Sequence, residues 1–161
     1  MFRLDVKTGR IAPLDEAAGE GTLVDLTGES APAEVPAEGP LVLRLPAAAE
    51  DADFAPLLAR AVAVEILPRH ARDGSPASLA RHLRRHFGYR GTIRIRGRLV
   101  PQMADLMRRV GVDALDLPEE PLAEAHARCL AIPKLWFQFA RDARPTVPEL
   151  RHGRSRKGVP A

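Results

Sequence analysis

Residues 61–117 read AVAVEILPRHARDGSPASLARHLRRHFGYRGTIRIRGRLVPQMADLMRRVGVDALDL, and this stretch decides the fold. Three short runs in it are apolar and rich in β-branched residues, as is typical of strands: Val62–Leu67, Thr92–Ile95 and Val112–Leu117. Two segments whose apolar residues recur at helical spacing lie between them. The alternating order predicts parallel strands joined by helical crossovers.

The first helical segment has both a start signal and a stop signal. Ser75 followed by Pro76 is typical of a helix N-terminus, because the serine oxygen accepts from a free backbone N–H and proline has no N–H to leave unpaired. Gly88 is predicted to end the helix. Its apolar face is predicted to consist of Leu79, Ala80, Leu83 and Phe87, and its solvent face of Arg81, Arg84 and Arg85.

The second helical segment is predicted to begin at Pro101 and to end at Gly111. Its apolar residues follow the i, i+3, i+4, i+7 spacing of an amphipathic helix, which predicts that Met103, Leu106, Met107 and Val110 are buried. A strand at Leu41–Leu45, a helix from Asp51 or Asp53 to Arg60 and a last helix from Glu119 to Leu130 complete about four β-α units.

The rest of the chain divides into segments of different composition. Residues 1–14 are predicted to form a small hairpin with its turn at Lys7-Thr8-Gly9. Residues 15–39 hold seven acids and no base, which predicts a solvated acidic connector around one short strand, Thr22–Leu26. Residues 40–140 are predicted to be the α/β domain, and residues 141–161 a basic disordered tail.

Charges inside the predicted strands bear on the architecture. A sheet covered on both faces is almost uninterruptedly apolar, whereas these strands contain Arg44, Glu65, Arg94, Arg96, Asp113 and Asp116. One face of the mainly parallel sheet is therefore predicted to be partly polar, with helices mainly on the other. This favours half of a β/α barrel whose concave face is closed by the N-terminal hairpin or by a second copy in a homodimer. A flavodoxin-like open sheet is the alternative.

Composition narrows the location of the protein and its classes of partner. The chain has 161 residues and a formal net charge of +3, but residues 141–161 hold six basic and two acidic residues, which leaves 18 basic and 19 acidic residues elsewhere. No apolar run approaches the roughly 18 residues that cross a bilayer, and the N-terminus lacks the apolar core of a signal peptide. Cys129 is the single cysteine. We expect a cytoplasmic protein that does not bind membranes.

Two arginine-bearing loops follow neighbouring predicted strands. Ligands of parallel α/β proteins bind where strands end and helices begin. Arg69 and Arg72 precede the helix start at Ser75, and Arg98 follows the next strand. Guanidinium groups bind sulfite, sulfate, phosphate or carboxylate through paired hydrogen bonds. The loops therefore predict a small-oxyanion site, and the alternative is that these arginines are solvated and that Asp73-Gly74 is a turn.

A set of short motifs resembles a family of uncharacterised bacterial proteins that are encoded beside sulfite reductase and are often labelled as oxidoreductases of sulfite reduction. The motifs lie between residues 40 and 140 and comprise Leu67-Pro68-Arg69, Asp73-Gly74, Ser78, Ala80-Arg81, Leu83-Arg84, Gly88-Tyr89-Arg90-Gly91, Gly97, Gln102, Arg108-Arg109 and Gly111-Val112-Asp113-Ala114. The resemblance implies a role in assimilatory sulfite and sulfate reduction that feeds cysteine synthesis. It adds Asp73, Gly74, Gly97 and Gln102 to the candidate site, while the acids that relatives carry near Arg98 and Pro101 are absent here.

The sequence itself contains no motif for a redox cofactor. It has no G-x-G-x-x-G after a strand, no P-loop and no cysteine pair, so no cofactor is predicted. His82 and His86 have the i, i+4 spacing of a metal clamp, but no third ligand is evident, and no metal is predicted. We therefore expect an accessory protein that serves sulfite reductase or another sulfur-assimilation enzyme. An enzyme acting on a sulfur oxyanion is the alternative.

The C-terminal part of the chain suggests two further possibilities. Trp136, Phe137 and Phe139 precede the basic tail and are predicted either to pack onto the core or to dock a partner. The basic tail is compatible with binding to nucleic acid, which is the rival class of function. Against it, the tail has no aromatic residue for base stacking, and the rest of the chain is close to neutral.

Overall fold

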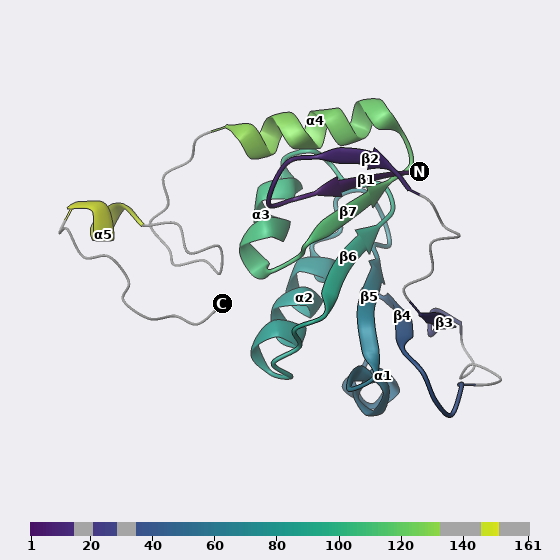
Figure 1. Cartoon of the computed structure of the whole chain (residues 1–161). Coiled ribbons are helices and arrows are strands. Elements are labelled where there is room, and N and C mark those ends of the chain that lie inside the picture. Colours follow the sequence, from purple (N-terminus) through teal and green to yellow (C-terminus); the bar gives the residue numbers. More distant parts are fainter. Residues whose placement is uncertain (15–20, 29–34, 133–145, 152–161) are drawn as a thin grey trace.

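The structure is a computed structural model that describes residues 1–14, 21–28, 35–132 and 146–151. Four β-α units follow one another as predicted (Figure 1). They are β4 (Leu41–Pro46), α1 (Asp51–Leu58), β5 (Ala61–Leu67), α2 (Ser75–Arg85), β6 (Thr92–Arg96), α3 (Met103–Val110), β7 (Ala114–Leu117) and α4 (Glu120–Ala131). Outside these units lie β1 (Phe2–Asp5), β2 (Ile11–Pro13), β3 (Thr22–Asp25) and the short helix α5 (Val147–Arg151).

The described strands form one mixed sheet in the order β2-β1-β7-β6-β5-β4-β3. The strands from β3 to β7 are parallel and adjacent in the order in which they occur along the chain. Because crossovers between parallel strands are right-handed, this sequential order places the connecting helices on one face of the sheet. The predicted α/β fold is thus confirmed. Its order is that of half of a β/α barrel and differs from the flavodoxin-like order.

The N-terminal hairpin is present, but it does not close the concave face of the sheet. Asp5 Oδ1 accepts hydrogen bonds from the backbone N–H groups of Lys7 and Thr8, both at 2.8 Å, and Gly9 completes the turn with φ of 74°. Strand β1 pairs antiparallel with β7 and thereby extends the sheet sideways. The expectation of a covering hairpin was therefore wrong, because β7 would otherwise present unpaired backbone groups at an open edge.

The helix-facing side of the sheet forms the hydrophobic core. Alternate residues along each strand point to this side, and the central strands contribute Leu43, Val64, Ile93 and Leu115, none of which is exposed to solvent. They join one cluster with apolar residues of the helices, such as Phe54, Leu83 and Met107. Core packing of this kind is the main stabilising term in an α/β domain.

The helix-free side of the sheet carries charges of alternating sign in register. Asp25, Arg44, Glu65 and Arg94 lie opposite one another across β3, β4, β5 and β6. A second row crosses β6, β7 and β1 and consists of Arg96, Asp116 and Arg3. Arg44 Nη2 lies 3.0 Å from Glu65 Oε2, and Arg3 Nε lies 2.7 Å from Asp116 Oδ1. The prediction of a partly polar face, inferred from charges inside the strands, is confirmed.

Arg84 departs from the amphipathic pattern predicted for α2. The sequence places it on the solvent face, but only 8% of it is exposed. Its guanidinium donates to the carbonyls of Gly111 (2.9 Å), Tyr89 (2.7 Å) and Gly91 (2.8 Å) and to Asp113 Oδ2 (2.6 Å). The prediction was wrong because these acceptors, most of them backbone carbonyls, satisfy the buried guanidinium inside the fold.

Several predicted segments lie partly or wholly outside the described residues. The acidic connector is described at residues 21–28 and 35–39, where β3 matches the predicted strand. The basic tail is described at residues 146–151, which include α5. Trp136, Phe137 and Phe139 lie outside the described residues. Among the helices of the described ranges, none is both long enough and apolar enough to cross a bilayer.

Candidate functional site

The loops that follow β5 and β6 meet at one edge of the sheet, as the parallel topology predicts. We call these two loops, residues 68–74 and 97–102, the rim. The backbone N–H of Val100 in the second loop donates to the carbonyl of Ala71 in the first at 2.9 Å. Gly97 adopts φ of 142°, and a Cβ there would lie 3.2 Å from Pro68 Cγ. The close approach of the two loops therefore favours glycine at position 97.

Asp73 organises the first rim loop. Its Oδ2 accepts the backbone N–H of Arg69 and its Oδ1 accepts that of Ser75, both at 2.9 Å. Burial alone would raise the pKa of Asp73, but hydrogen bonds from Arg69 and Ser75 outweigh it and hold this pKa well below its ordinary value. Asp73, rather than the predicted Ser75 side chain, therefore satisfies a free N–H at the start of α2.

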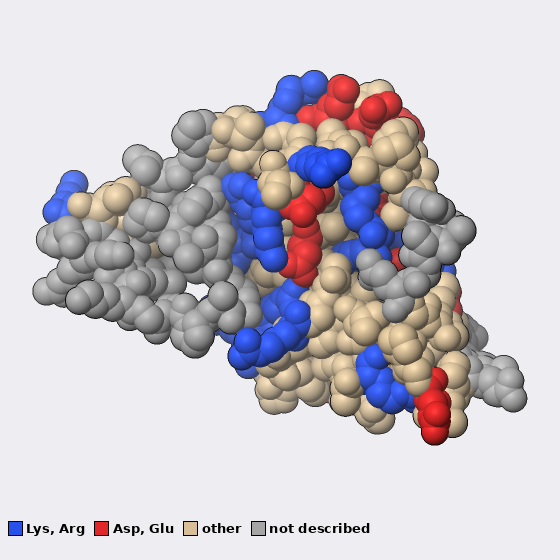
Figure 2. Space-filling view, viewed as in Figure 1, with Lys and Arg blue, Asp and Glu red and all other residues tan. Residues whose placement is uncertain are grey.

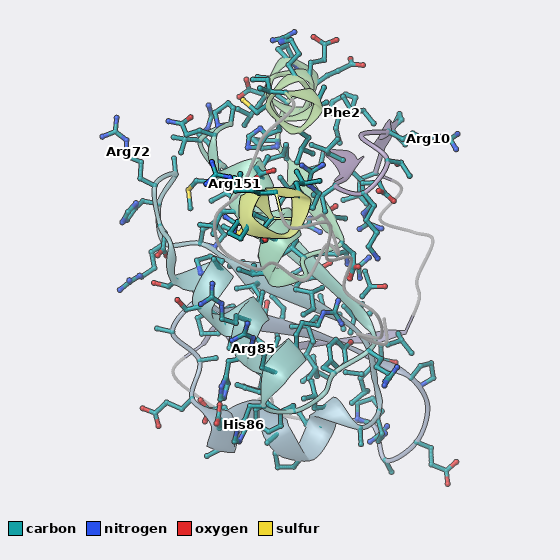
Figure 3. The ribbon with its side chains drawn as sticks, turned by 90° about the vertical axis from the view of Figure 1, so that its left-hand side faces the viewer. Phe2, Arg10, Arg72, Arg85, His86 and Arg151 are labelled. Carbon is teal, nitrogen blue, oxygen red and sulfur yellow. The ribbon has the colours of Figure 1, made fainter. Side chains whose placement is uncertain are left out.

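Two of the three predicted rim arginines are bound by groups of the protein itself. Arg69 Nε lies 3.4 Å from Asp73 Oδ2, and its Nη2 donates to Ser75 Oγ at 3.1 Å. Arg98 pairs with Glu119, which lies just before α4. Arg72 is exposed and extends away from the ribbon (Figure 3). The three guanidinium groups thus do not converge on a common point.

The other predicted rim residues are placed mainly by the backbone. Gly74 precedes α2 and has no side chain with which to cap it, and Gln102 precedes α3 without making a side-chain cap hydrogen bond. Both residues are exposed. The structure therefore brings Arg69, Asp73 and Ser75 into one hydrogen-bonded group, while Arg98 pairs at a different helix.

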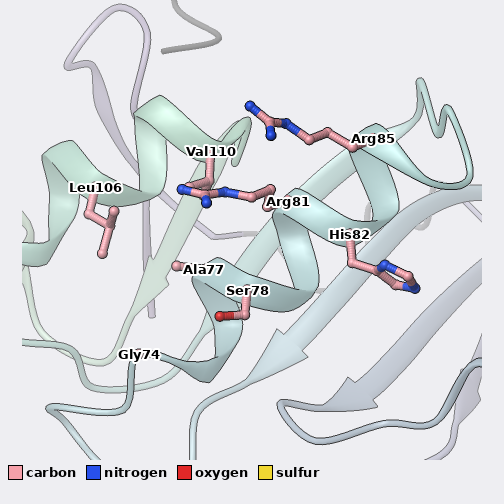
Figure 4. Close-up of a pocket in the computed structure, with 8 residues that line it drawn as sticks. All are labelled: Gly74, Ala77, Ser78, Arg81, His82, Arg85, Leu106 and Val110. Carbon is pink, nitrogen blue, oxygen red and sulfur yellow. The ribbon is translucent and has the colours of Figure 1, made fainter. Parts of the chain in front are cut away.

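A second candidate site lies between α2 and α3 (Figure 4), and we call it the α2–α3 groove. Its volume is about 470 Å³. The α2 side provides Ala77, Ser78, Arg81, His82 and Arg85, with Gly74 at the start of the helix, and the α3 side provides Leu106 and Val110. The prediction that Leu106 is buried was wrong, because 38% of it is exposed beside this groove.

The arginines of the groove differ from Arg69 and Arg98 of the rim. Arg81 and Arg85 are exposed, and neither forms an ion pair or a side-chain hydrogen bond with any residue in the described part of the chain. Among the residues that the structure describes, no acidic residue lines the groove. Side chains of α1, by contrast, contact α2 and the residues just after it. The ring of Phe54 packs edge-on against that of Phe87, and Asp51 Oδ1 lies 2.9 Å from His82 Nε2.

A comparison with known protein families identifies the family of this chain. Residues 42–147 match a family of bacterial proteins of unknown function, DUF934. The chain belongs to the DUF934 family. The family's description names no reaction and no partner, so the link to sulfite reductase inferred from the sequence motifs is not part of it. No curated protein and no solved structure matches the chain.

The part of the chain that matches DUF934 contains both the rim and the α2–α3 groove. It begins within β4 and includes α1 to α4, whereas β1, β2 and β3 lie before it. Both candidate sites therefore belong to the region that this chain shares with the DUF934 family.

The remaining candidate chemistry in this DUF934 protein is sparse within the described residues. No group of three metal-binding side chains occurs among them. His82 and His86 stack at 4.8 Å between ring centroids. His126 is fully buried, its Nδ1–H donates to the Leu122 carbonyl at 2.7 Å, and burial lowers its pKa despite this bond. A hydrogen-bonded core histidine with a lowered pKa is neutral at pH 7.

Proposed function

We propose that this DUF934 protein is an accessory protein of assimilatory sulfite and sulfate reduction that acts by binding a partner. The observation that carries the binding role is the open α2–α3 groove, where Arg81 and Arg85 have no acidic partner among the described residues and Leu106 is exposed. Charged side chains without partners beside exposed apolar surface are typical of a recognition surface. The assignment to sulfur assimilation is supported by the motif resemblance alone.

The arrangement of the rim supports partner binding over turnover of a small oxyanion there. Sulfite bound at Arg69 would have to compete with the Asp73 carboxylate, which already accepts two backbone N–H groups and the guanidinium. Because hydrogen bonds from Arg69 and Ser75 lower the pKa of Asp73 despite its burial, it keeps its negative charge at neutral pH. Like charges at close range repel, so the Asp73 carboxylate opposes an anion placed beside Arg69.

Oxyanion binding at the rim is the second candidate function. Arg72 favours it, because it is exposed and its guanidinium has no ion-pair partner among the described residues. The nucleic-acid alternative has less support. On the face shown in Figure 2, the described basic and acidic side chains are interspersed, so that face presents no field of a single sign.

A growth experiment tests the proposed function. Deleting the gene should impair growth on sulfate or sulfite as sole sulfur source and leave growth on cysteine unchanged. The tagged full-length protein should also enrich sulfite reductase, or another enzyme of sulfur assimilation, from a lysate of sulfate-grown cells. Normal growth of the deletion strain on sulfate, together with no enrichment of any such enzyme, would overturn the proposal.

A further inference from the structure

Two lines of side chains face each other across the α2–α3 groove (Figure 4). On α2 they are Ala77, Arg81 and Arg85, and on α3 they are Leu106 and Val110. Residues four positions apart lie one above the other on the same side of a helix, so each helix presents a continuous line to the groove. The groove therefore has the direction and periodicity of the helices that form it.

The two sides of the groove differ in chemical character. The α2 side is basic, because Arg81 and Arg85 are exposed one turn apart and have no ion-pair partner in the described structure. The α3 side is apolar, because Leu106 and Val110 lie on it. A molecule that fits both sides must carry acidic groups along one edge and apolar groups along the other.

The shape of the groove suits an elongated partner. Its volume is about 470 Å³, residues of two adjacent helices line it, and this lining includes the small side chain of Ala77. Small residues allow the backbone of a second helix to approach closely, while an exposed leucine gives it an apolar contact. Amphipathic helices bind into grooves between helices in this way, with anchors at i, i+3, i+4 and i+7.

We propose that the α2–α3 groove binds an acidic amphipathic helix of a partner protein. Carboxylates one turn apart on that helix pair with Arg81 and Arg85, and apolar side chains on its adjacent face pack against Leu106 and Val110. This inference rests on the proposed partner-binding role and names the chemistry of the partner. A single-stranded nucleic acid fits less well, because among the described residues the groove has no phenylalanine, tyrosine or tryptophan on which a base could stack.

A peptide selection tests this inference. The immobilised full chain is challenged with a displayed library of helical peptides about 15 residues long, the length at which isolated helices begin to be stable, with all charged and apolar positions randomised. We expect enrichment of peptides with acidic residues one turn apart beside a leucine-type face. Reversing both groove arginines (Arg81→Glu with Arg85→Glu) should weaken the selected peptides by about tenfold or more.

Matched variants separate the groove from general charge effects. Leu106→Asp should also weaken binding by about tenfold, because it removes the apolar contact and repels the acidic helix. Arg10→Glu is a charge-reversal control outside the groove, matched in net charge to Arg81→Glu or Arg85→Glu made singly, because Arg10 is exposed and projects from the N-terminal hairpin away from α2 (Figure 3). It should leave peptide affinity within about twofold.

Three results would overturn the proposal. They are an absence of enrichment over a parallel selection on the doubly reversed variant, enrichment of peptides without net negative charge, and binding that survives reversal of both arginines. Binding of a single-stranded oligonucleotide that is lost when both arginines are reversed, while acidic peptides do not bind, would assign the groove to phosphate instead.

Two outcomes separate this inference from the proposed function. If peptides bind as expected but the deletion strain grows normally on sulfate, the groove assignment holds and the sulfur assignment fails. If sulfite reductase is still enriched by the doubly reversed variant, the function stands and the groove assignment fails.

Discussion

The rim pairs two of its three arginines with acidic residues, whereas the α2–α3 groove pairs neither of its two with any described residue. At the rim, Arg69 is bound by Asp73 and Arg98 by Glu119. In the groove, Arg81 and Arg85 have no such partner among the described residues. This difference indicates that an arginine is evidence for a binding surface only when the fold itself provides no partner for its guanidinium group. The following predictions test this contrast, beginning with the largest expected effect.

Arg84 is the extreme case of an arginine bound by its own fold. Arg84→Met should lower the free energy of unfolding by about 3–5 kcal/mol, because the partly buried Asp113 carboxylate and three backbone carbonyls lose the buried guanidinium that donates to them. Arg85→Met on the same helix should change it by less than about 0.5 kcal/mol. Urea denaturation of both variants measures this difference in the free energy of unfolding. Equal losses would contradict the distinction between a buried, hydrogen-bonded arginine and an exposed one.

Asp73→Asn should lower the free energy of unfolding by about 1–3 kcal/mol, because an amide replaces the charged acceptor of the rim loop. The pKa of Asp73 is lowered in the folded state. Its stabilising contribution is therefore complete above the unfolded pKa of about 3.9 and is lost as the pH falls through the folded value. Wild-type stability should thus fall more steeply than that of the variant below about pH 4. Parallel slopes in acid denaturation would rule out this role of Asp73.

Replacing both groove arginines with alanine should leave the fold intact. Because neither side chain has a partner in the described structure, the free energy of unfolding should change by less than about 0.5 kcal/mol for each substitution. Thermal melting of Arg81→Ala with Arg85→Ala checks this expectation. A loss comparable to that of Arg84→Met would show that the two arginines serve the fold and not a partner.

The smallest expected effect is the binding of sulfite, sulfate or phosphate to the protein. We expect no binding tighter than about 1 mM by calorimetry, since Asp73 and Glu119 already neutralise Arg69 and Arg98. A tighter interaction that disappears in Arg69→Ala or Arg72→Ala would instead favour the oxyanion candidate.

Most of the fold could be predicted from the sequence, because its signals are local. Residues 61–117 alternate strand and helix patterns, and Gly111 ends α3 in the left-handed conformation with φ of 98°. The position of the hairpin could not be predicted in this way. Pairing of β1 with β7 joins the two ends of the domain, and no local pattern reports which strand forms an open edge.

For the candidate site, the sequence predicted which loops meet but not which side chains pair there. Parallel strands imply that the loops after β5 and β6 meet, and the hydrogen bond between Val100 and Ala71 shows that they do. The neutralisation of Arg98 depends on Glu119, which is distant in sequence. The groove was missed because helical periodicity assigned Leu106 to the core. The available signal was that Arg81 and Arg85 share a one-turn spacing with Ala77.

The charge rows on the helix-free side of the sheet have a consequence for folding. If β5 slipped by one residue along β4, Arg44 would face an apolar neighbour and Glu65 would turn toward the hydrophobic core. A carboxylate moved into that core without its arginines carries a large desolvation penalty. The alternating rows therefore discriminate against misaligned sheets, so that electrostatics selects one strand alignment among those that hydrophobic burial alone would tolerate.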